Sequence, residues 1–333
     1  MSEPTKRRRR WFSLSLRGLM LLILVIGIPM GWKARRASLQ RRAVAKIRRL
    51  SGAVDYDWQV NGIFRTKATG PKAPLWLRTI FGGEYFQEVV NVRIPDIELW
   101  EVTESERAFE ADQLACLDDL DRIEDLWVGY GKLKPEGLAR LARKGRIKDL
   151  SLLTCPLGDD GLENLGRLGN LESLCIALKP DIDPELAFLD RLPRLSSLQI
   201  LTAPITDPGL SRIGRLTRLE TLFIGNSNLT DASLERLKSL KHLDSLTIMK
   251  APGFTKNGLS HLLNLPGLSS LDLPGTPGTD EELDLLVKLP ELNEISLQRG
   301  TISDNKINNL KATRPRLRLH LLDDKIQPDP FLE

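Results

Sequence analysis

The chain has 333 residues, of which 63 are leucine and only 5% are aromatic. This composition disfavours one compact domain with a mixed aliphatic and aromatic core. It indicates a core of many small packing layers of the same kind, built from leucine. The net charge of +4 combines two opposite parts: residues 1–50 carry 14 basic and 1 acidic side chains, and the remainder carries 34 basic and 43 acidic ones. The first part suits anionic lipid or nucleic acid, and the second is typical of an ordinary solvated domain.

The first element predicted along the chain is a membrane-spanning helix over residues 11–32, behind a basic tail of residues 1–10. Residues 18–32 carry no charged side chain, and the apolar character extends back to Trp11, interrupted only by Arg17. From Trp11 to Trp32 a helix measures about 32 Å, close to the ~30 Å hydrocarbon core of a bilayer. The two tryptophans suit the two interfacial belts, and Arg17 can snorkel toward a headgroup.

A cleaved signal peptide is the competing interpretation of this segment, because a basic stretch over residues 6–10 precedes the apolar one. The sequence lacks a small-x-small cleavage site, and basic residues follow Trp32 directly, which favours an uncleaved anchor. Basic residues flank the segment in similar numbers, so the positive-inside rule is nearly balanced. Because a short arginine-rich tail is hard to translocate, we expect the N-terminus in the cytoplasm and the rest of the chain outside.

Residues 33–50 are predicted to form a basic amphipathic juxtamembrane helix. Leu39, Ala43, Ile47 and Leu50 fall on one face at helical spacing, with arginines around them. One interpretation is a helix lying on anionic headgroups, and the other is a continuation of the anchor whose arginines stop transfer. Both stay open, whereas nucleic-acid binding is disfavoured because no aromatic stacking residues are interleaved.

Residues 89–320 are predicted to consist of a repeated unit. The pattern L-x-x-L-x-L recurs at intervals of 24 or 25 residues, with first positions at Ile123, Ile147, Leu171, Leu195, Leu219, Leu243, Leu268 and Leu292. Val89, Val92 and Ile94 are predicted to form a first strand ahead of these copies. Residues 51–88 are predicted to be an N-terminal cap whose aromatic bulk covers the open end of the stack, from Tyr56, Trp58, Phe64, Trp76, Phe81, Tyr85 and Phe86.

The second half of each copy predicts a short helix. In residues 205–210 and 229–234, Asp207 and Asp231 suit helix N-caps, and Pro208 suits the first helical position. Leucines and isoleucines then follow at helical spacing. Each copy is therefore a strand, a turn and a helix that cannot bury its own leucines, so the copies must stack. This predicts an α/β solenoid with parallel strands on the concave face and short helices on the convex face.

The pattern L-x-x-L-x-L followed by I-T-D-x-G-L-x-x-L resembles that of bacterial leucine-rich-repeat proteins, often membrane-anchored, of the cysteine-containing, ribonuclease-inhibitor-like type. The resemblance covers about residues 120–320 and implies a curved protein-binding solenoid without catalytic residues. Two copies depart from the pattern, at residues 181–186 and 275–282, and we expect them to be irregular. Residues 315–319 are predicted to be the last edge strand, and residues 321–333 a loose tail.

No catalytic or metal-binding motif stands out, so we expect neither an enzyme nor a cofactor or metal site. His242 and His261 fall in convex segments and are interpreted as solvated surface. The acidic pairs at residues 118–119 and 159–160 are interpreted as helix caps or solvated faces in preference to calcium ligands. Of the three cysteines, Cys155 is expected to pack inward and Cys175 to point outward, so we expect no bond between them.

Period-two alternation places the residues flanking the inward strand positions on the concave face. Five of these are large and apolar, and they form the candidate partner-binding site: Trp127, Leu153, Leu201, Phe223 and Met249. The sequence therefore favours a membrane-anchored scaffold that binds a protein or peptide on this face and contacts lipid through residues 11–50.

Two other functions stay open at this point. One is a substrate-receptor subunit of an enzyme complex, for which only residues 51–88 are available to recruit the complex. The other is a lipid- or nucleic-acid-associated regulator acting through residues 33–50.

Overall fold

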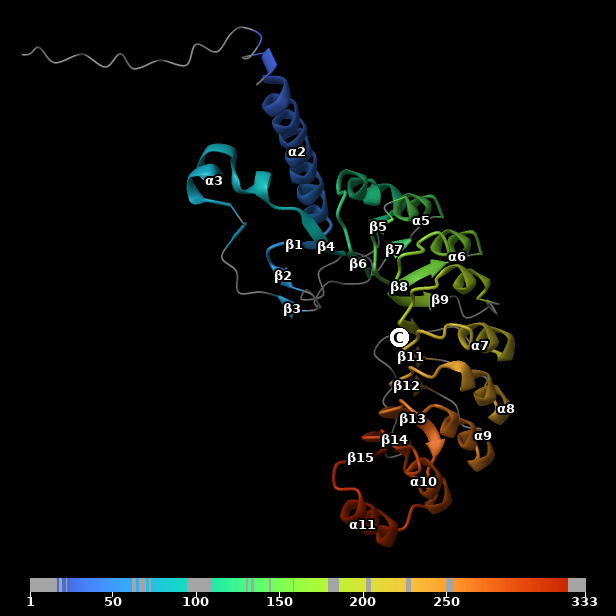
Figure 1. Ribbon diagram of the computed structural model, residues 1–333. Helices are drawn as coiled ribbons and strands as arrows, with labels where there is room; N and C mark the ends of the chain where they lie inside the picture. The colour runs from blue at the N-terminus through green and yellow to red at the C-terminus, as the bar shows by residue number, and fades with distance from the viewer. Residues whose placement is uncertain are drawn as a thin grey trace, which may run out of the picture.

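The computed structural model describes residues 17, 20–21, 23–61, 64–65, 70–71, 73–94, 109–129, 131–132, 135–143, 145–157, 159–178, 186–201, 205–225, 229–249 and 254–322. These residues form a curved solenoid with strands along its inner side and short helices along its outer side (Figure 1). A long helix stands at the N-terminal end. The tail at residues 323–333 and residues 1–16 lie outside the described residues.

One 11-stranded sheet runs the length of the solenoid, and its strands follow the chain order. The strands are β1 (Ala53–Tyr56), β4 (Val89–Ile94), β6 (Asp125–Val128), β8 (Asp149–Leu157), β9 (Ser173–Leu178), β10 (Ser197–Ile200), β11 (Thr221–Ile224), β12 (Ser245–Ile248), β13 (Ser270–Pro277), β14 (Glu294–Gln298) and β15 (Arg318–Leu322). All neighbours that pair are parallel except β1 and β4, which are antiparallel. Two small pairs join β2 (Val60–Asn61) to β3 (Phe64–Arg65) and β5 (Phe109–Glu110) to β7 (Gly131–Lys132).

The outer side carries one short helical segment in most repeats. These segments are η3 (Ala111–Asp119), α5 (Pro135–Ala142), α6 (Asp159–Leu165), η4 (Ala187–Arg191), α7 (Asp207–Ile213), α8 (Asp231–Leu234) with η5 (Glu235–Ser239), α9 (Lys256–Ser260) with η6 (His261–Asn264), α10 (Asp280–Leu286) and α11 (Asp304–Thr313). The N-terminal region adds the π-helical turn η1 (Ile23–Gly27), α2 (Ile28–Arg49), α3 (Leu75–Phe81) and η2 (Gly83–Phe86).

The predicted register of the repeat is confirmed along the sheet. Leu198 of β10 lies opposite Leu174 of β9 and Leu222 of β11, and Leu246 of β12 lies opposite Leu271 of β13. These leucines are 0% exposed, and so are the isoleucines two residues further along β9 to β12. The stack buries each repeat's apolar side chains against the next repeat, which a single repeat cannot achieve.

Two irregular stretches were expected, and the structure describes one of them fully. At residues 275–282, β13 runs on to Pro277 before α10 begins. In the other copy, residues 181–185 lie outside the described residues, but Leu186 has a left-handed φ of 52° and the short 3₁₀ helix η4 follows it. The C-terminal edge strand forms as β15, although it begins at Arg318 and not at residue 315. The loose tail predicted over residues 321–333 is wrong for Leu321 and Leu322, which pair with β14.

The helix caps differ from the expectation. Thr206 and Thr230 are the N-caps of α7 and α8, and Asp207 and Asp231 are the first helical residues that follow them. Pro208 is thus the second helical residue. The carboxylates of Asp207 and Asp231 bind the next repeat and not the start of their own helix.

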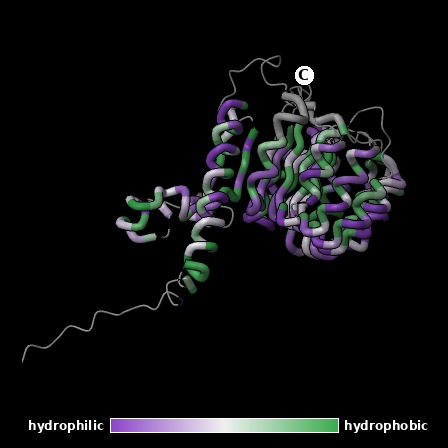
Figure 2. Tube along the Cα trace, turned by 90° about the horizontal axis from the view of Figure 1, so that it is seen from above, coloured by the Kyte–Doolittle hydropathy of each residue, from purple (hydrophilic) through white to green (hydrophobic). Residues whose placement is uncertain are grey.

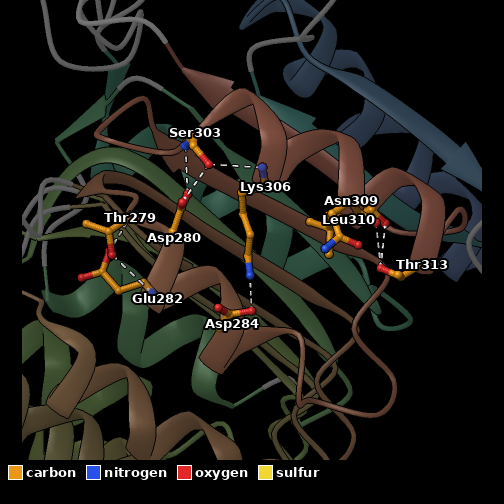
Figure 3. A network of polar contacts seen from close by, with 9 residues as sticks. All are labelled: Thr279, Asp280, Glu282, Asp284, Ser303, Lys306, Asn309, Leu310 and Thr313. Atoms are coloured by element: carbon orange, nitrogen blue, oxygen red, sulfur yellow. Dashed lines mark hydrogen bonds and ion pairs between the residues drawn. The ribbon is translucent and has the colours of Figure 1, made fainter.

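These aspartates join neighbouring repeats. Asp231 accepts a hydrogen bond from the backbone N–H of Thr255 at 2.8 Å and another from its hydroxyl, and Thr255 is the N-cap of α9. Asp280 accepts from the N–H and the hydroxyl of Ser303, both at 2.8 Å, in the same arrangement (Figure 3). Each carboxylate therefore satisfies a donor at the start of the following helix and fixes the spacing between two repeats.

This contact also explains the glycine of the T-D-x-G-L motif. A Cβ at Gly258 would lie 2.2 Å from Oδ1 and 2.8 Å from Cα of Asp231, so the position has no room for a side chain. In the preceding repeat, Ser233 stands at this position and donates its hydroxyl to Asp207. In α8 and α9 the third helical residue is therefore small, because an aspartate of the previous repeat lies against it. In α11 the third helical residue is Lys306, so the close approach is specific to the middle repeats.

The N-terminal cap is built by α2, and this differs from the predicted division of the chain. Ala43, Val44 and Ile47 are buried in the core together with Val92 and Ile94 of β4. Gln40 accepts from the N–H of Val89 at 3.2 Å and donates to the carbonyl of Gln87 at 3.1 Å, which fixes the helix on the sheet. The apolar face that we assigned to lipid headgroups, or to a continued anchor, thus contacts protein over residues 43–47.

The aromatic residues expected to cover the open end of the stack do so only in part. Tyr56 packs against the core, but Trp76 and Phe81 of α3 are exposed. The side chain of Phe64 lies outside the described residues. The cap can do without α3 because α2 already covers the apolar end of the stack, and β1 pairs with the edge of β4.

The membrane anchor predicted over residues 11–32 is described only in part. Residues 11–16, 18, 19 and 22 lie outside the described residues, and residues 23–32 form η1 and the start of α2. Within the portion of the chain that the structure describes, no helix has the length and apolar character that a bilayer crossing needs.

We expect the alternation along β11 to appear directly in stability. Leu222→Ala removes a 0%-exposed side chain and should lower the free energy of unfolding by about 2–5 kcal/mol, because it leaves a cavity in mid-stack. Phe223→Ala changes a partly exposed side chain on the same strand and should lower it by about 1 kcal/mol or less. Chemical unfolding followed by circular dichroism measures both values, and equal losses would contradict the register.

Candidate functional site

The concave face of the sheet presents three outward residues on most strands. Two of these positions were recognised from the sequence, namely the residue between the two inward positions and the residue after the second. The third precedes the first inward position and was missed, although the same alternation predicts it. From β4 to β15 it is occupied by Asn91, Asp125, Asp149, Ser173, Ser197, Thr221, Ser245, Ser270, Glu294 and Arg318, which pair in register.

The five predicted apolar residues all lie on this face and are all partly exposed. Trp127 of β6 and Leu153 of β8 stand on adjacent strands. Phe223 lies in β11, and Leu201 and Met249 directly follow the two neighbouring strands, β10 and β12. They therefore form two groups, which β9 separates with the smaller residues Cys175 and Ala177.

The backbone holds the second group rigidly. The N–H of Leu201 donates to the carbonyl of Ile176 at 2.9 Å, and the N–H of Met249 donates to the carbonyl of Ile224 at 2.8 Å. These bonds extend the parallel ladder by one residue beyond each strand. Between them, Gly225 lies so close to Leu201 that a Cβ would be 2.1 Å from its carbonyl oxygen. The glycine thus permits the tight approach of two repeats beside Phe223.

Acidic groups gather at the N-terminal end of the concave face. Arg93 pairs with Asp55 at 2.9 Å, and the side-chain amide of Asn91 donates to Asp125 at 2.8 Å. Burial and the nearby carboxylate of Asp149 raise the pKa of Asp125 to about 6, against the opposing effect of Arg93. Burial, and then the charge of Glu172, also raises the pKa of Asp149.

The C-terminal end shows the same effect more weakly. Burial raises the pKa of Asp272 on β13, although a hydrogen bond from Ser296 opposes the change. Next to it, Nε2 of His320 lies 3.3 Å from a carboxylate oxygen of Glu294. Carboxylates toward both ends of the concave face are therefore partly withdrawn from water.

The thiol of Cys175 is not an activated nucleophile on this face. Burial raises the pKa of the Cys175 thiol to about 11, so the thiol stays protonated at neutral pH. Cys175 is a free thiol. The side chain of Cys155 lies outside the described residues, and Cys116 is buried with a pKa that burial raises.

The other candidate groups do not converge on one point. His242 is exposed and His261 is half-buried, both on the outer side. Asp118 and Asp119 end the 3₁₀ helix η3, and Asp159 and Asp160 begin α6. In the described parts of the chain, no three histidine, cysteine or acidic residues are grouped as metal ligands would be.

Two shallow pockets lie at the cap and not on the concave face. They measure about 200 and 380 Å³ and lie between α2 and residues 84–88. Ion pairs join the walls of the first one, where the carboxylate of Glu88 pairs with the guanidinium of Arg36 at 3.6 Å and with that of Arg122. The opposite charges on its walls thus neutralise each other. These ion pairs attach α2 to the segment that leads into the first repeat.

The parallel strand ladder with its 24-residue period decides the architecture. It is a leucine-rich-repeat solenoid. No protein-family model matches the sequence, and no functionally curated protein matches it.

Solved structures with a similar arrangement include two internalins from Listeria monocytogenes. Internalin F is 18% identical, covers 64% of this chain and 77% of its own, and has a TM-score of 0.35. Internalin C2 is 20% identical, with 66% and 84% covered and a TM-score of 0.37. The ectodomain of the Arabidopsis thaliana membrane receptor kinase GASSHO1/SCHENGEN3, solved with CASPARIAN STRIP INTEGRITY FACTOR 2, is 23% identical over 59% of this chain and 23% of its own, with a TM-score of 0.40.

The raised pKa of Asp125 predicts a dependence of stability on pH. Between about pH 4 and 6 the folded chain holds a proton on Asp125 that the unfolded chain releases, so this group favours folding more as the pH falls through that window. Asp125→Asn should therefore raise the free energy of unfolding at pH 8 by about 1 kcal/mol, and the gain should vanish near pH 4. Chemical unfolding of both proteins across this range measures the difference. A gain that is constant with pH would contradict the assignment.

Proposed function

We propose that this chain is a membrane-anchored scaffold that binds a protein or peptide on the concave face of its solenoid, and that it is not an enzyme. The observation that carries the proposal is the presence of five large apolar side chains on a sheet face that meets water. A face of this kind gains stability when a partner covers it, because apolar surface is then removed from water.

The rest of the face suits a polypeptide ligand. Hydroxyl groups line the column beside the second apolar group, at Ser197, Thr221 and Ser245, all partly exposed. Hydroxyls both donate and accept hydrogen bonds, as the backbone of a bound segment requires. The carboxylates at the two ends favour a ligand with basic groups at its margins, because complementary charges select among partners.

The proposal includes the anchor over residues 11–32, with the N-terminus in the cytoplasm and the solenoid outside. Its support is the uncharged stretch of residues 18–32 and the exposure of the apolar residues described between 20 and 32. Lipid is the environment in which such side chains are stable. Lipid contact by the C-terminal half of residues 33–50 is less favoured, because Ala43, Val44 and Ile47 pack against the first repeat.

Of the alternatives, a regulator acting through residues 33–50 keeps some support from the exposed basic side chains of α2, among them Arg41, Arg42 and Lys46. Those groups can contact anionic lipid or nucleic acid while the opposite face of α2 caps the solenoid. A substrate-receptor subunit of an enzyme complex would use the concave face in the same way, with the cap region joined to the complex.

Partner capture tests the concave site. The full chain in detergent, with Leu201→Ser and Phe223→Ser together, should lose the partner that the unchanged chain retains, because both substitutions remove apolar contact area from the second group. Leu263→Ser is the matched control, since Leu263 is a similarly apolar side chain, 38% exposed, on the outer helical side. It should retain the partner. Retention by the double variant, with unchanged thermal stability, would place the binding site elsewhere.

Alkaline carbonate extraction tests the anchor. The full chain should stay in the membrane pellet in carbonate and in high salt, because a spanning helix does not depend on surface charge. The double variant Leu24→Arg, Val25→Arg, which changes two exposed side chains within the apolar stretch, should be released. Release of the unchanged chain would contradict the anchor and leave the concave site untouched.

A further inference from the structure

Exposed apolar surface is concentrated at one end of the molecule. Of the fourteen large apolar side chains that are exposed among the described residues, eight lie between Met20 and Trp32 and four lie in α3. The other two, Leu263 and Leu322, stand singly on the solenoid. Figure 2 shows α3 on the side of α2 that faces away from the solenoid. None of the repeat residues that the structure describes therefore covers it.

The helix α3 exposes large apolar side chains that are usually buried in a folded protein. Leu75 is 77% exposed, Trp76 63% and Ile80 65%. Trp76 and Ile80 are four residues apart, so their side chains share one face of the helix. A leucine, a tryptophan and an isoleucine that are held in water on one short helix mark a surface that another phase or molecule covers.

Contacts with α2 fix the level at which α3 stands. The hydroxyl of Tyr85 donates to the carbonyl of Met30 at 3.2 Å, and Nζ of Lys33 lies 5.2 Å from the centre of the Tyr85 ring. The ring of Phe81, at the end of α3, stacks on Tyr85 with centroids 5.4 Å apart. The helix is therefore attached beside residues 30–33, where the uncharged stretch of the chain ends and the basic stretch begins.

We propose that α3 is a second membrane contact, an interfacial helix that inserts Leu75, Trp76 and Ile80 into the surface of the bilayer that residues 11–32 cross. The inference rests on the proposed anchor. In that placement Trp32 marks the headgroup level, and α3, held beside Met30 and Lys33, lies at the same depth.

Charge supports a bilayer that contains anionic lipid. On α2, Lys33, Arg35, Arg41 and Arg42 are exposed on the solvent side of this level. Basic side chains there are attracted to anionic headgroups, while the apolar side chains of α3 enter the hydrocarbon boundary. Two contacts, one crossing and one lying in the surface, would hold the solenoid at a fixed tilt to the membrane.

Tryptophan quenching by lipid tests this placement in the full chain. The protein is reconstituted in vesicles of phosphatidylcholine and phosphatidylglycerol, either normal or brominated on the acyl carbons nearest the headgroup. Trp76→Phe should reduce the fraction of the emission that brominated lipid quenches, because Trp76 is then absent from the interface. Trp127→Phe is the matched control, since Trp127 lies on the concave face, and it should raise that fraction or leave it unchanged.

A second variant keeps the test independent of Trp76 itself. Leu75→Ser with Ile80→Ser should cut the lipid quenching attributed to Trp76 at least two-fold, whereas Leu263→Ser should not. Because these side chains lie outside the core, thermal unfolding of the solenoid should be unchanged in all variants.

The outcomes separate the two membrane proposals. Equal quenching of the unchanged chain and of Trp76→Phe, in vesicles that resist carbonate, overturns the role of α3 and leaves the anchor in place. Quenching of Trp76 in a chain that carbonate releases overturns the anchor and supports α3 as a surface contact. Shielding of Trp76 from aqueous iodide without quenching by lipid means that protein covers α3, either a second copy or another part of this chain, and overturns the lipid assignment.

Discussion

The whole molecule depends on the burial of one repeat's leucines by the next. Leu222 is completely buried only because Leu198 and Leu246 lie beside it at the same height in the sheet. Carboxylates on the outer side reinforce this stacking, since Asp231 and Asp280 each bind the first turn of the following helix. Stability thus depends on contacts between neighbouring repeats. An uncovered end of the stack would expose apolar side chains of the terminal repeat to water.

The need to close that end explains the arrangement of the N-terminal region. Ile47 of α2 fills the end of the core, and β1 pairs antiparallel with β4, which ends the parallel ladder. A helix that continues a proposed membrane anchor therefore also completes the solenoid. A chain that begins at Ser51 would lose Ala43, Val44 and Ile47 and expose the first layer of the core, so a soluble form of the solenoid has to retain the C-terminal half of α2.

The candidate site follows from the same geometry. Because successive strands stay in register, side chains on the outward face form columns, and any apolar residue in a column stands beside its counterparts in adjacent repeats. Leu201, Phe223 and Met249 gather in this way without contributing to the core. Partial burial raises the pKa of Asp125 and Asp272 at the two ends of the same face.

The amino-acid sequence by itself determined the period of 24 residues, the inward leucines and the outward position of Phe223, because these depend on local alternation and spacing. It also placed the five apolar residues on one face. Only the tertiary structure decided that Ile47 is buried in the core that also contains Val92, that Trp76 is exposed, and that Asp231 binds Thr255. Each of these depends on which segments distant in sequence meet, and an apolar helical face looks the same in sequence whether protein, lipid or water lies against it.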